Sequence, residues 1–229
     1  MANIRFLPCG DSAVTVEFGS TIDDALNAAV HAFAGAVEGL PLPAVREVVP
    51  TYRSATVHYD PAAIAYQDLL DLLRPLARDA GACRAEGPVV EIPVLYGGAW
   101  GPDLQEVADH CGLTPQQVIQ LHSAPDYRIY MLGFTPGFPY LGGMDARLAT
   151  PRRREPRVRI PAGSVGIAGA QTGVYPIQSP GGWQLIGRTP LRLFDPALDP
   201  PILLAAGQRI RFVPIDQAAY EKLEGRGRP

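Results

Sequence analysis

The first 87 residues alternate short β-branched runs with longer segments in which apolar residues recur at helical spacing. Three runs, at 13–18, 45–49 and 54–59, are typical of strands. Apolar stripes over 22–37 and 69–76 predict two helices. The order β-α-β-β-α favours a split βαβ unit of ferredoxin-like type over one sheet.

The two predicted helices also carry starting signals. Thr21 precedes the first apolar stripe and is expected to act as its N-cap. Asp60 followed by Pro61 predicts the start of the second helix, since aspartate is a favoured cap and proline suits the first helical position. Thr114, Pro115 and Gln117 form the same kind of signal, a capping box, in the second half.

The second half has a different pattern. Gly87-Pro88 is the predicted hinge, which divides the chain into domains at 1–87 and 88–229. A strand at 89–94 and short helices at 102–111 and 115–123 come first. Apolar runs separated by Gly/Pro turns then predict a closed or nearly closed antiparallel β-barrel. These runs are 127–132, 157–161, 164–168, 174–177, 183–187, 191–194 and 209–214. The fold class is therefore predicted as α+β.

Composition supports short strands and a real core. Of 229 residues, 47% are apolar, and glycine and proline number 24 each, which excludes a helical bundle. No apolar window approaches the length of a membrane span, and the first residues contain no signal-peptide core. The three cysteines, Cys9, Cys83 and Cys111, are far apart and odd in number. We therefore expect a cytoplasmic protein with free thiols.

Charge argues against nucleic acid and membrane partners. The net charge is −3, with −5 in residues 1–87 and +2 in residues 88–229, so neither half has a strong field. The helix pair in 103–123 has helix-turn-helix spacing. It contains three acids and no arginine or lysine, so a DNA phosphate would be repelled.

The single lysine removes several reaction classes. Lys222 stands against 19 arginines and lies in a polar tail that we expect to fray. A Walker A loop, a pyridoxal Schiff base and a biotin carrier all need a lysine in a structured position. The sequence also contains no G-x-S-x-G elbow and no metal-binding spacing of histidine or cysteine, so we expect no metal site and assign no catalytic residue.

Two further features have alternative interpretations. The arginine-rich stretch from Arg147 to Arg159 is either a solvated connector or an anion contact, for which Arg157 and Arg159 are the better candidates because they share a strand face. The glycines at 163, 166 and 169 resemble a phosphate loop only loosely, since no helix is expected after them.

Three Gly/Pro-rich loops, at 133–143, 161–176 and 179–190, combine rigid turns with aromatic and neutral polar side chains. Such loops can line a pocket for a small polar ligand, with aromatic walls and amide or hydroxyl donors. They can equally be barrel corners, where glycine and proline serve geometry alone. The pattern leaves both interpretations open for each loop, and their similarity favours one shared pocket.

These loops also carry a family resemblance. The strings GDSAVTVEFG, YMLGFTPGFPYLGGMD and TPRRREPRVRIPAGSVGIAGAQTGVYPIQSPGGWQLIGRTPLRLFD resemble the KipI / allophanate hydrolase subunit 1 family over nearly the whole chain. The resemblance implies a small α/β N-terminal domain followed by a cyclophilin-like β-barrel. It also implies partners: a homologous second subunit of the PxpC or KipA type, and a third subunit of the PxpA type.

The family resemblance implies more than one function. The first is a non-autonomous subunit of an ATP-dependent 5-oxoprolinase, which cleaves 5-oxo-L-proline to L-glutamate. ATP would be bound by the complex, at a site that the sequence does not assign. The alternatives are a KipI-type inhibitor of a sensor histidine kinase and a carboxyltransferase component of urea carboxylase or allophanate hydrolase.

The resemblance further implies that residues in the matching strings bind the small cyclic amide. Arg159 or Arg188 would supply positive charge there. The expected binding residues are Phe134, Pro136, Phe138, Tyr140, Arg159, Gly163, Ser164, Gln171, Thr172, Tyr175, Ser179, Gly181, Gly182, Trp183, Arg188 and Thr189.

Overall fold

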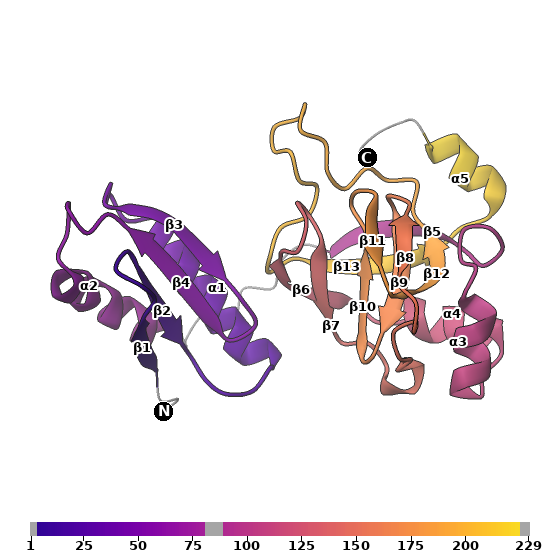
Figure 1. Cartoon of the computed structure of the whole chain (residues 1–229), viewed down its shortest axis with the longest axis horizontal. Helices are drawn as coiled ribbons and strands as arrows, with labels where there is room; N and C mark the ends of the chain where they lie inside the picture. Colours follow the sequence, from indigo (N-terminus) through magenta and orange to yellow (C-terminus); the bar gives the residue numbers. More distant parts are fainter. Residues whose placement is uncertain (1–3, 81–88, 225–229) are drawn as a thin grey trace. The chain divides into compact units, whose positions relative to one another are not determined.

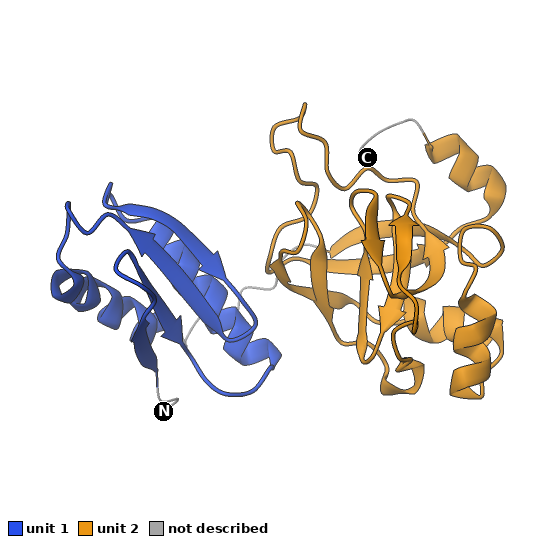
Figure 2. Ribbon diagram, viewed as in Figure 1, with its two compact units in different colours: residues 1–86 blue, residues 87–229 orange. Residues whose placement is uncertain are grey.

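The chain divides into two compact units, Met1–Glu86 and Gly87–Pro229, shown in the computed structural model of Figures 1 and 2. The structure describes residues 4–80 and 89–224. The predicted hinge at Gly87-Pro88 and the thiol of Cys83 lie outside these ranges. Cys9 and Cys111 are free cysteines. None of the described helices is long and apolar enough to cross a membrane.

Unit 1 is a four-stranded antiparallel sheet in the order β1-β2-β4-β3, with two helices packed on one face (Figure 1). Strands β2 and β3 both pair with β4, and α1 connects them, so the predicted split βαβ unit is confirmed. The edge strand β1 was not predicted. The elements are β1 (Arg5–Pro8), β2 (Ala13–Glu17), α1 (Asp24–Glu38), β3 (Val45–Pro50), β4 (Ser54–Tyr59) and α2 (Tyr66–Asp79).

Two predicted helix starts in unit 1 are wrong. Asp23, rather than Thr21, caps α1, and its carboxylate accepts the Leu26 N–H at 2.8 Å. The Asp60 carboxylate accepts the Ala62 N–H at 3.0 Å, so it closes a local turn. Helix α2 begins later, at Tyr66, with no side-chain cap. Aspartate favours turns as strongly as helix caps, and here the turn forms.

Unit 2 is a nearly closed barrel, as predicted (Figure 1). Its sheet runs β10-β9-β12-β5-β13-β6-β7, and the ends approach each other, since a Cβ on Gly173 of β10 would lie 3.3 Å from the Pro139 carbonyl of β7. The bounds are β5 (Val89–Tyr96), β6 (Tyr127–Leu132), β7 (Pro139–Gly142), β9 (Ser164–Ala168), β10 (Gln171–Val174), β12 (Gln184–Arg188) and β13 (Arg209–Pro214), with a separate ribbon of β8 (Arg157–Ile160) and β11 (Ser179–Gly181).

The barrel departs from the sequence prediction in four places. The strand predicted at 174–177 is not formed, because β10 ends at Val174 and residues 175–178 are not in a strand. Strands β5 and β13 pair in parallel, so the sheet is not wholly antiparallel. Strand β7 forms inside a segment predicted as a loop. The predicted strand at 191–194 is reduced to an isolated bridge between Phe194 and Ile202.

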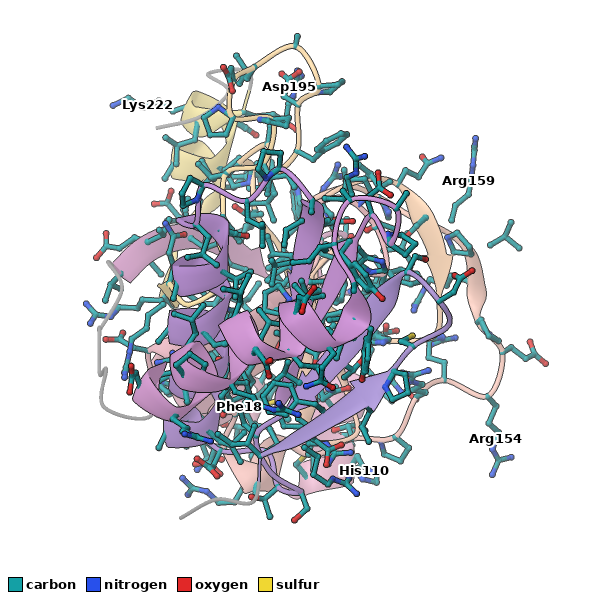
Figure 3. The ribbon with its side chains drawn as sticks, turned by 90° about the vertical axis from the view of Figure 1, so that its left-hand side faces the viewer. Phe18, His110, Arg154, Arg159, Asp195 and Lys222 are labelled. Carbon is teal, nitrogen blue, oxygen red and sulfur yellow. The ribbon has the colours of Figure 1, made fainter. Side chains whose placement is uncertain are left out.

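Helices α3 (Leu104–Cys111) and α4 (Pro115–Ser123) pack on the barrel, and the predicted Thr114–Gln117 capping box is present at α4. A short 3₁₀ turn, η2, spans Ala146–Leu148. Lys222 belongs to α5 (Gln217–Leu223), where Figure 3 shows it at the helix surface, so the expectation of a frayed tail is wrong at this position. The Asp216 cap and the buried Tyr220 hold this helix on the barrel.

A buried histidine joins α4 to the barrel. His122 is fully buried, with Nδ1 at 2.8 Å from the Tyr96 hydroxyl and Nε2 at 2.8 Å from the Thr172 hydroxyl. Thr172 donates its own proton to the Gly166 carbonyl at 3.0 Å, so it accepts from Nε2–H and leaves Nδ1 as an acceptor. Burial lowers the pKa of His122 to about 3. The imidazole is therefore neutral and structural.

This histidine predicts acid sensitivity. The pKa is 6.5 in the unfolded chain and about 3 in the fold, so the unfolded state binds one more proton between these values. The free energy of unfolding is highest above pH 6.5 and falls toward pH 3 by about 1.4 kcal/mol per pH unit from this group. Urea denaturation from pH 6.5 to 4.5 should show this slope in the wild type and a flatter one in His122→Gln. The exposed His110→Gln is the control, and equal slopes in all three proteins would contradict the assignment.

A buried carboxylate fixes the arginine-rich segment. Asp103, before α3, has a side chain only 4% exposed. Arg157 donates to both of its oxygens at 2.8 and 2.7 Å, and Arg153 donates at 3.1 Å. The Leu185 N–H of β12 donates at 2.6 Å. We call these four residues the Asp103 clamp. It ties the start of α3, β12, the segment before β8 and the first residue of β8 together.

Removing the clamp carboxylate should be costly. Asp103→Ala leaves the Arg157 guanidinium and the buried Leu185 N–H without their acceptor, and leaves Arg153 only the more distant Glu106. This should lower the free energy of unfolding by about 3 kcal/mol. Asp126→Ala breaks an exposed pair with Arg211, at 2.7 Å, and should cost less than about 1 kcal/mol. Chemical denaturation compares the two. Equal losses would show that the clamp is no more than a surface ion pair.

Candidate functional site

Residues of all three Gly/Pro loops meet at one cavity of about 380 Å³ in unit 2. Each loop contributes to its wall, and the segment before β8 completes it. We call it the aromatic cavity. Its lining residues are Phe134, Phe138, Tyr140, Arg152, Pro156, Gln171, Tyr175, Pro180, Gly181, Gly182 and Trp183.

Phe138 is the centre of the cavity wall. It is 2% exposed, and its ring makes edge-to-face contacts with four others. The ring centroids lie 5.3 to 5.7 Å from its own, within the range that aromatic pairs favour. The four partners are Phe134, Tyr140, Tyr175 and Trp183. The wall is therefore a packed and preformed aromatic cluster.

Phe134 combines strain with exposure. Its φ is +64°, and it is the only non-glycine residue with positive φ in the described ranges 4–80 and 89–224. The Thr135 N–H donates to the Gly133 carbonyl at 2.7 Å, which closes a tight three-residue turn around Phe134. Its side chain is 66% exposed, although its ring edge packs on Phe138. A strained backbone that displays an apolar ring beside a cavity marks a candidate binding position.

The polar groups of the cavity are few. Burial raises the pKa of Tyr175 to about 12, against the opposing charges of Arg152 and Arg157. The Tyr175 hydroxyl is therefore a proton donor at neutral pH. The Gln171 amide and the Arg152 guanidinium complete the set. Among the described lining residues there is no carboxylate, imidazole or thiol, so this wall holds and orients a ligand and offers no nucleophile or general base.

Half of the residues expected at the site lie elsewhere. Pro136 lines an adjoining shallow hollow with Phe134 and Ile202. Ser164, Thr172 and Thr189 are buried in the barrel. The remaining four, Arg159, Gly163, Ser179 and Arg188, do not line the aromatic cavity either.

The two arginines expected to supply charge are both off the cavity. Arg159 is exposed and projects outward from β8 (Figure 3). Arg188 donates its Nε–H to the Ala162 carbonyl at 2.9 Å. The Gly163 turn has φ +81°, and a Cβ there would lie 2.3 Å from the Thr189 carbonyl, so its role is geometric.

The sequence patterns did not indicate Arg152, Pro156 and Pro180 at the cavity. They favoured Arg157 and Arg159 over Arg152, but Arg157 is bound to Asp103. Nothing in the local pattern distinguishes Arg152 from the neighbouring arginines. The distinction from Arg153 and Arg157 depends on Asp103, which binds both and lies far away in the sequence.

No metal or phosphate-loop geometry is found in the part of the chain that the structure describes. No three histidine, cysteine or acidic side chains come together there. The glycines at 163, 166 and 169 belong to a turn, to β9 and to the β9–β10 turn, with no helix after them. The weak resemblance to a phosphate loop therefore has no structural counterpart.

Adjacent glycines of the cavity wall provide a matched test. A Cβ on Gly181 would lie 2.6 Å from the Tyr175 hydroxyl oxygen and 2.8 Å from Ile160 Cδ1, whereas a Cβ on Gly182 meets nothing closer than 3.7 Å. Gly181→Ala should lower the free energy of unfolding by about 1–3 kcal/mol through overpacking. Gly182→Ala should change it by less than about 0.5 kcal/mol. Thermal unfolding measures both, and equal effects would contradict the close packing at Gly181.

Comparisons with known proteins agree with this architecture. The chain is 48% identical over 225 residues to the B subunit of 5-oxoprolinase from Bacillus subtilis (strain 168), covering 92% of both chains. It is 47% identical over 215 residues to the B subunit of 5-oxoprolinase from Escherichia coli O157:H7, covering 93% of this chain and 97% of that one.

Solved structures share the fold. The crystal structure of TTHA0988 matches 89% of this chain with a TM-score of 0.80 and 40% identity, and this chain spans 40% of that longer one. The Kluyveromyces lactis urea carboxylase matches 98% of this chain with a TM-score of 0.74, and this chain spans 23% of it. At 20% identity, that second likeness shows the fold alone.

The family model described as "Carboxyltransferase domain, subdomain C and D" matches residues 4–204. The relatives named above also confirm the resemblance carried by the loop strings. The chain therefore belongs to the family of carboxyltransferase domain subdomains C and D.

Proposed function

We propose that this chain is the B-type subunit of an ATP-dependent 5-oxoprolinase, and that its aromatic cavity binds the cyclic amide substrate. The observation that carries the proposal is the 48% identity, over 92% of both chains, to the B subunit of a 5-oxoprolinase. Identity of this extent covers both units of the fold and the loops that form the cavity.

The proposed reaction requires ATP and catalytic groups in addition to a cavity that binds the substrate. Opening 5-oxo-L-proline adds one water across the ring C–N bond and yields the carboxylate and amine of L-glutamate. The amide is stable, so ATP is hydrolysed by a second water to ADP and phosphate, and this hydrolysis drives the ring opening. The aromatic cavity offers flat apolar walls for a small ring, with the Tyr175 hydroxyl and the Gln171 amide as hydrogen-bond groups.

The missing chemistry would come from other subunits. A nucleophile, a base and a nucleotide site are all needed, and the described lining of the cavity has none of the usual acid, imidazole or thiol groups. We propose that a homologous second subunit and a third subunit complete the reaction centre and that ATP binds to the complex. The word "subunit" in the names of the relatives supports such an assembly.

A carboxyltransferase role in urea metabolism has weaker support. The likeness to the urea carboxylase is one of fold, at 20% identity, and extends over 23% of that enzyme. Fold alone does not carry a reaction from one protein to another.

Reconstitution tests the proposed function. The chain is purified with the products of its neighbouring subunit genes, and ADP release is measured with and without 5-oxo-L-proline. We expect release that depends on 5-oxo-L-proline, is matched by glutamate formed, and is lost when this chain is omitted. An unchanged rate without the chain, or a chain that co-purifies only with a histidine kinase, would overturn the proposal.

A variant connects the function to the cavity. Phe134→Ala removes an exposed ring from the cavity mouth without opening the core, so the fold should persist. The complex should then show a KM for 5-oxo-L-proline raised by about tenfold or more, the loss of roughly one good apolar contact. Leu198→Ala, which removes another exposed apolar side chain away from the cavity, is the control. An unchanged KM in Phe134→Ala would place substrate binding elsewhere.

A further inference from the structure

The aromatic cavity adjoins a second, polar hollow of about 430 Å³, and the two share a single lining residue, Arg152. We call the second hollow the polar groove. It is lined by Glu106, His110, Thr150, Pro151, Arg152, Arg153, Arg154, Glu155 and Gln184. Arg152 therefore stands where apolar ring walls give way to a charged surface.

Arg152 differs from Arg153 and Arg157 of the same segment in having no ion-pair partner within the described ranges. Arg153 binds Asp103 at 3.1 Å and lies 3.6 Å from Glu106, and Arg157 binds Asp103 at 2.7 Å. Arg152 forms no hydrogen bond or ion pair through its side chain with any residue in the described ranges 4–80 and 89–224. Its charge is exposed at the mouth of the cavity and is available to a ligand.

Its neighbours hold the base of the side chain in place. The Asp103 clamp holds the next residue, Arg153, and the Arg153 backbone N–H donates to the Gly182 carbonyl of the cavity wall at 2.7 Å. Pro156, further along, lines the same cavity. The backbone beside Arg152 is thus attached to the wall that the ligand would touch, while the guanidinium itself keeps its freedom to meet an anion.

The charge of Arg152 also borders the aromatic cavity, because Arg152 lines that cavity together with Tyr175. Its positive charge opposes the rise that burial causes in the pKa of Tyr175. Arg154 differs, since it lines only the polar groove and projects outward (Figure 3).

We propose that Arg152 is the specificity residue that binds the carboxylate of a small cyclic amide acid whose ring lies in the aromatic cavity. The planar guanidinium donates two parallel N–H bonds to a carboxylate, which fixes the direction of the ligand as well as its affinity. The flat ring would pack between side chains such as Phe134 and Trp183, and the amide would face the Tyr175 hydroxyl. This inference rests on the proposed function, because 5-oxo-L-proline has this ring and this carboxylate.

Two ligands distinguish the binding of the ring amide from the binding of the carboxylate. 5-Oxo-L-proline has the ring amide and the carboxylate, and 2-pyrrolidinone has the ring amide alone. Equilibrium dialysis measures the Kd of each for the complex assembled with its partner subunits, without ATP. We expect the wild type to bind 5-oxo-L-proline at least tenfold more tightly than 2-pyrrolidinone.

Variants then assign this difference to one residue. Arg152→Gln should weaken 5-oxo-L-proline binding by tenfold or more and leave 2-pyrrolidinone binding unchanged. Arg152→Lys keeps the charge and loses the planar fork, so its loss should be intermediate. Arg154→Gln removes a neighbouring exposed charge that does not line the aromatic cavity and should change neither Kd.

Three outcomes would overturn the inference: wild-type affinity for 5-oxo-L-proline in Arg152→Gln, an equal loss for both ligands, or no preference for the carboxylate in the wild type. The proposed function fails separately. Arg152-dependent binding without ring opening in the complete complex would refute the 5-oxoprolinase activity and retain the carboxylate site. Ring opening with an unchanged KM in Arg152→Gln would refute the carboxylate site and retain the 5-oxoprolinase activity.

Discussion

A single buried carboxylate determines how unit 2 presents its cavity. Asp103 is surrounded by two guanidinium groups and a backbone N–H, so nearly all of its hydrogen-bonding capacity is used inside the protein. Such a group is expensive to bury unless it is fully paired, and the pairing here spans more than 80 residues of sequence, from α3 to β12. The arginine-rich segment is consequently part of the folded wall and has only a few free charges.

The aromatic cluster forms the apolar side of the cavity, and the Asp103 clamp positions the charged side. Phe138 and its ring partners fill space with fixed edge-to-face geometry, which makes one side apolar and rigid. The clamp brings up the opposite, charged side without neutralising Arg152. Phe134 is the exception within the cluster, because its backbone is strained and its ring is mostly exposed. Strain at an exposed position persists only if the neighbouring turns impose it, and three hydrogen bonds of the 133–138 turn do so.

The sequence predicted correctly those features that depend on residues close together in the chain. The Thr114–Gln117 capping box and the split βαβ unit follow from spacing within a few residues, and both are present. The parallel pairing of β5 with β13 joins segments more than 100 residues apart, and no local pattern encodes it. The prediction at Asp60 was wrong because turn and helix cap use the same side chain in the same way.

The sequence predicted that the loops of the site converge, but it did not predict which of their polar residues line the cavity. Loops rich in glycine, proline and aromatic residues did converge, since such residues pack at barrel ends where the chain turns sharply. The small hydroxyl residues of those loops were harder to place. Ser164 and Thr172 look the same in sequence whether they face a ligand or satisfy a buried partner, and Thr172 is occupied by His122 and the Gly166 carbonyl. Arg152 was identifiable only once Asp103 was known to bind Arg153 and Arg157, and Arg154 and Arg159 were seen to point away from the cavity.

The composition of the cavity supports the proposal that it is an incomplete reaction centre. Its described lining contains no carboxylate, imidazole or thiol. Here the walls pack closely around Phe138, the Tyr175 hydroxyl is kept protonated, and a cation stands free at the edge. In the proposed complex these features would position a small anionic ring against the aromatic wall. Because the described lining supplies no nucleophile, that group and the nucleotide would have to come from another subunit.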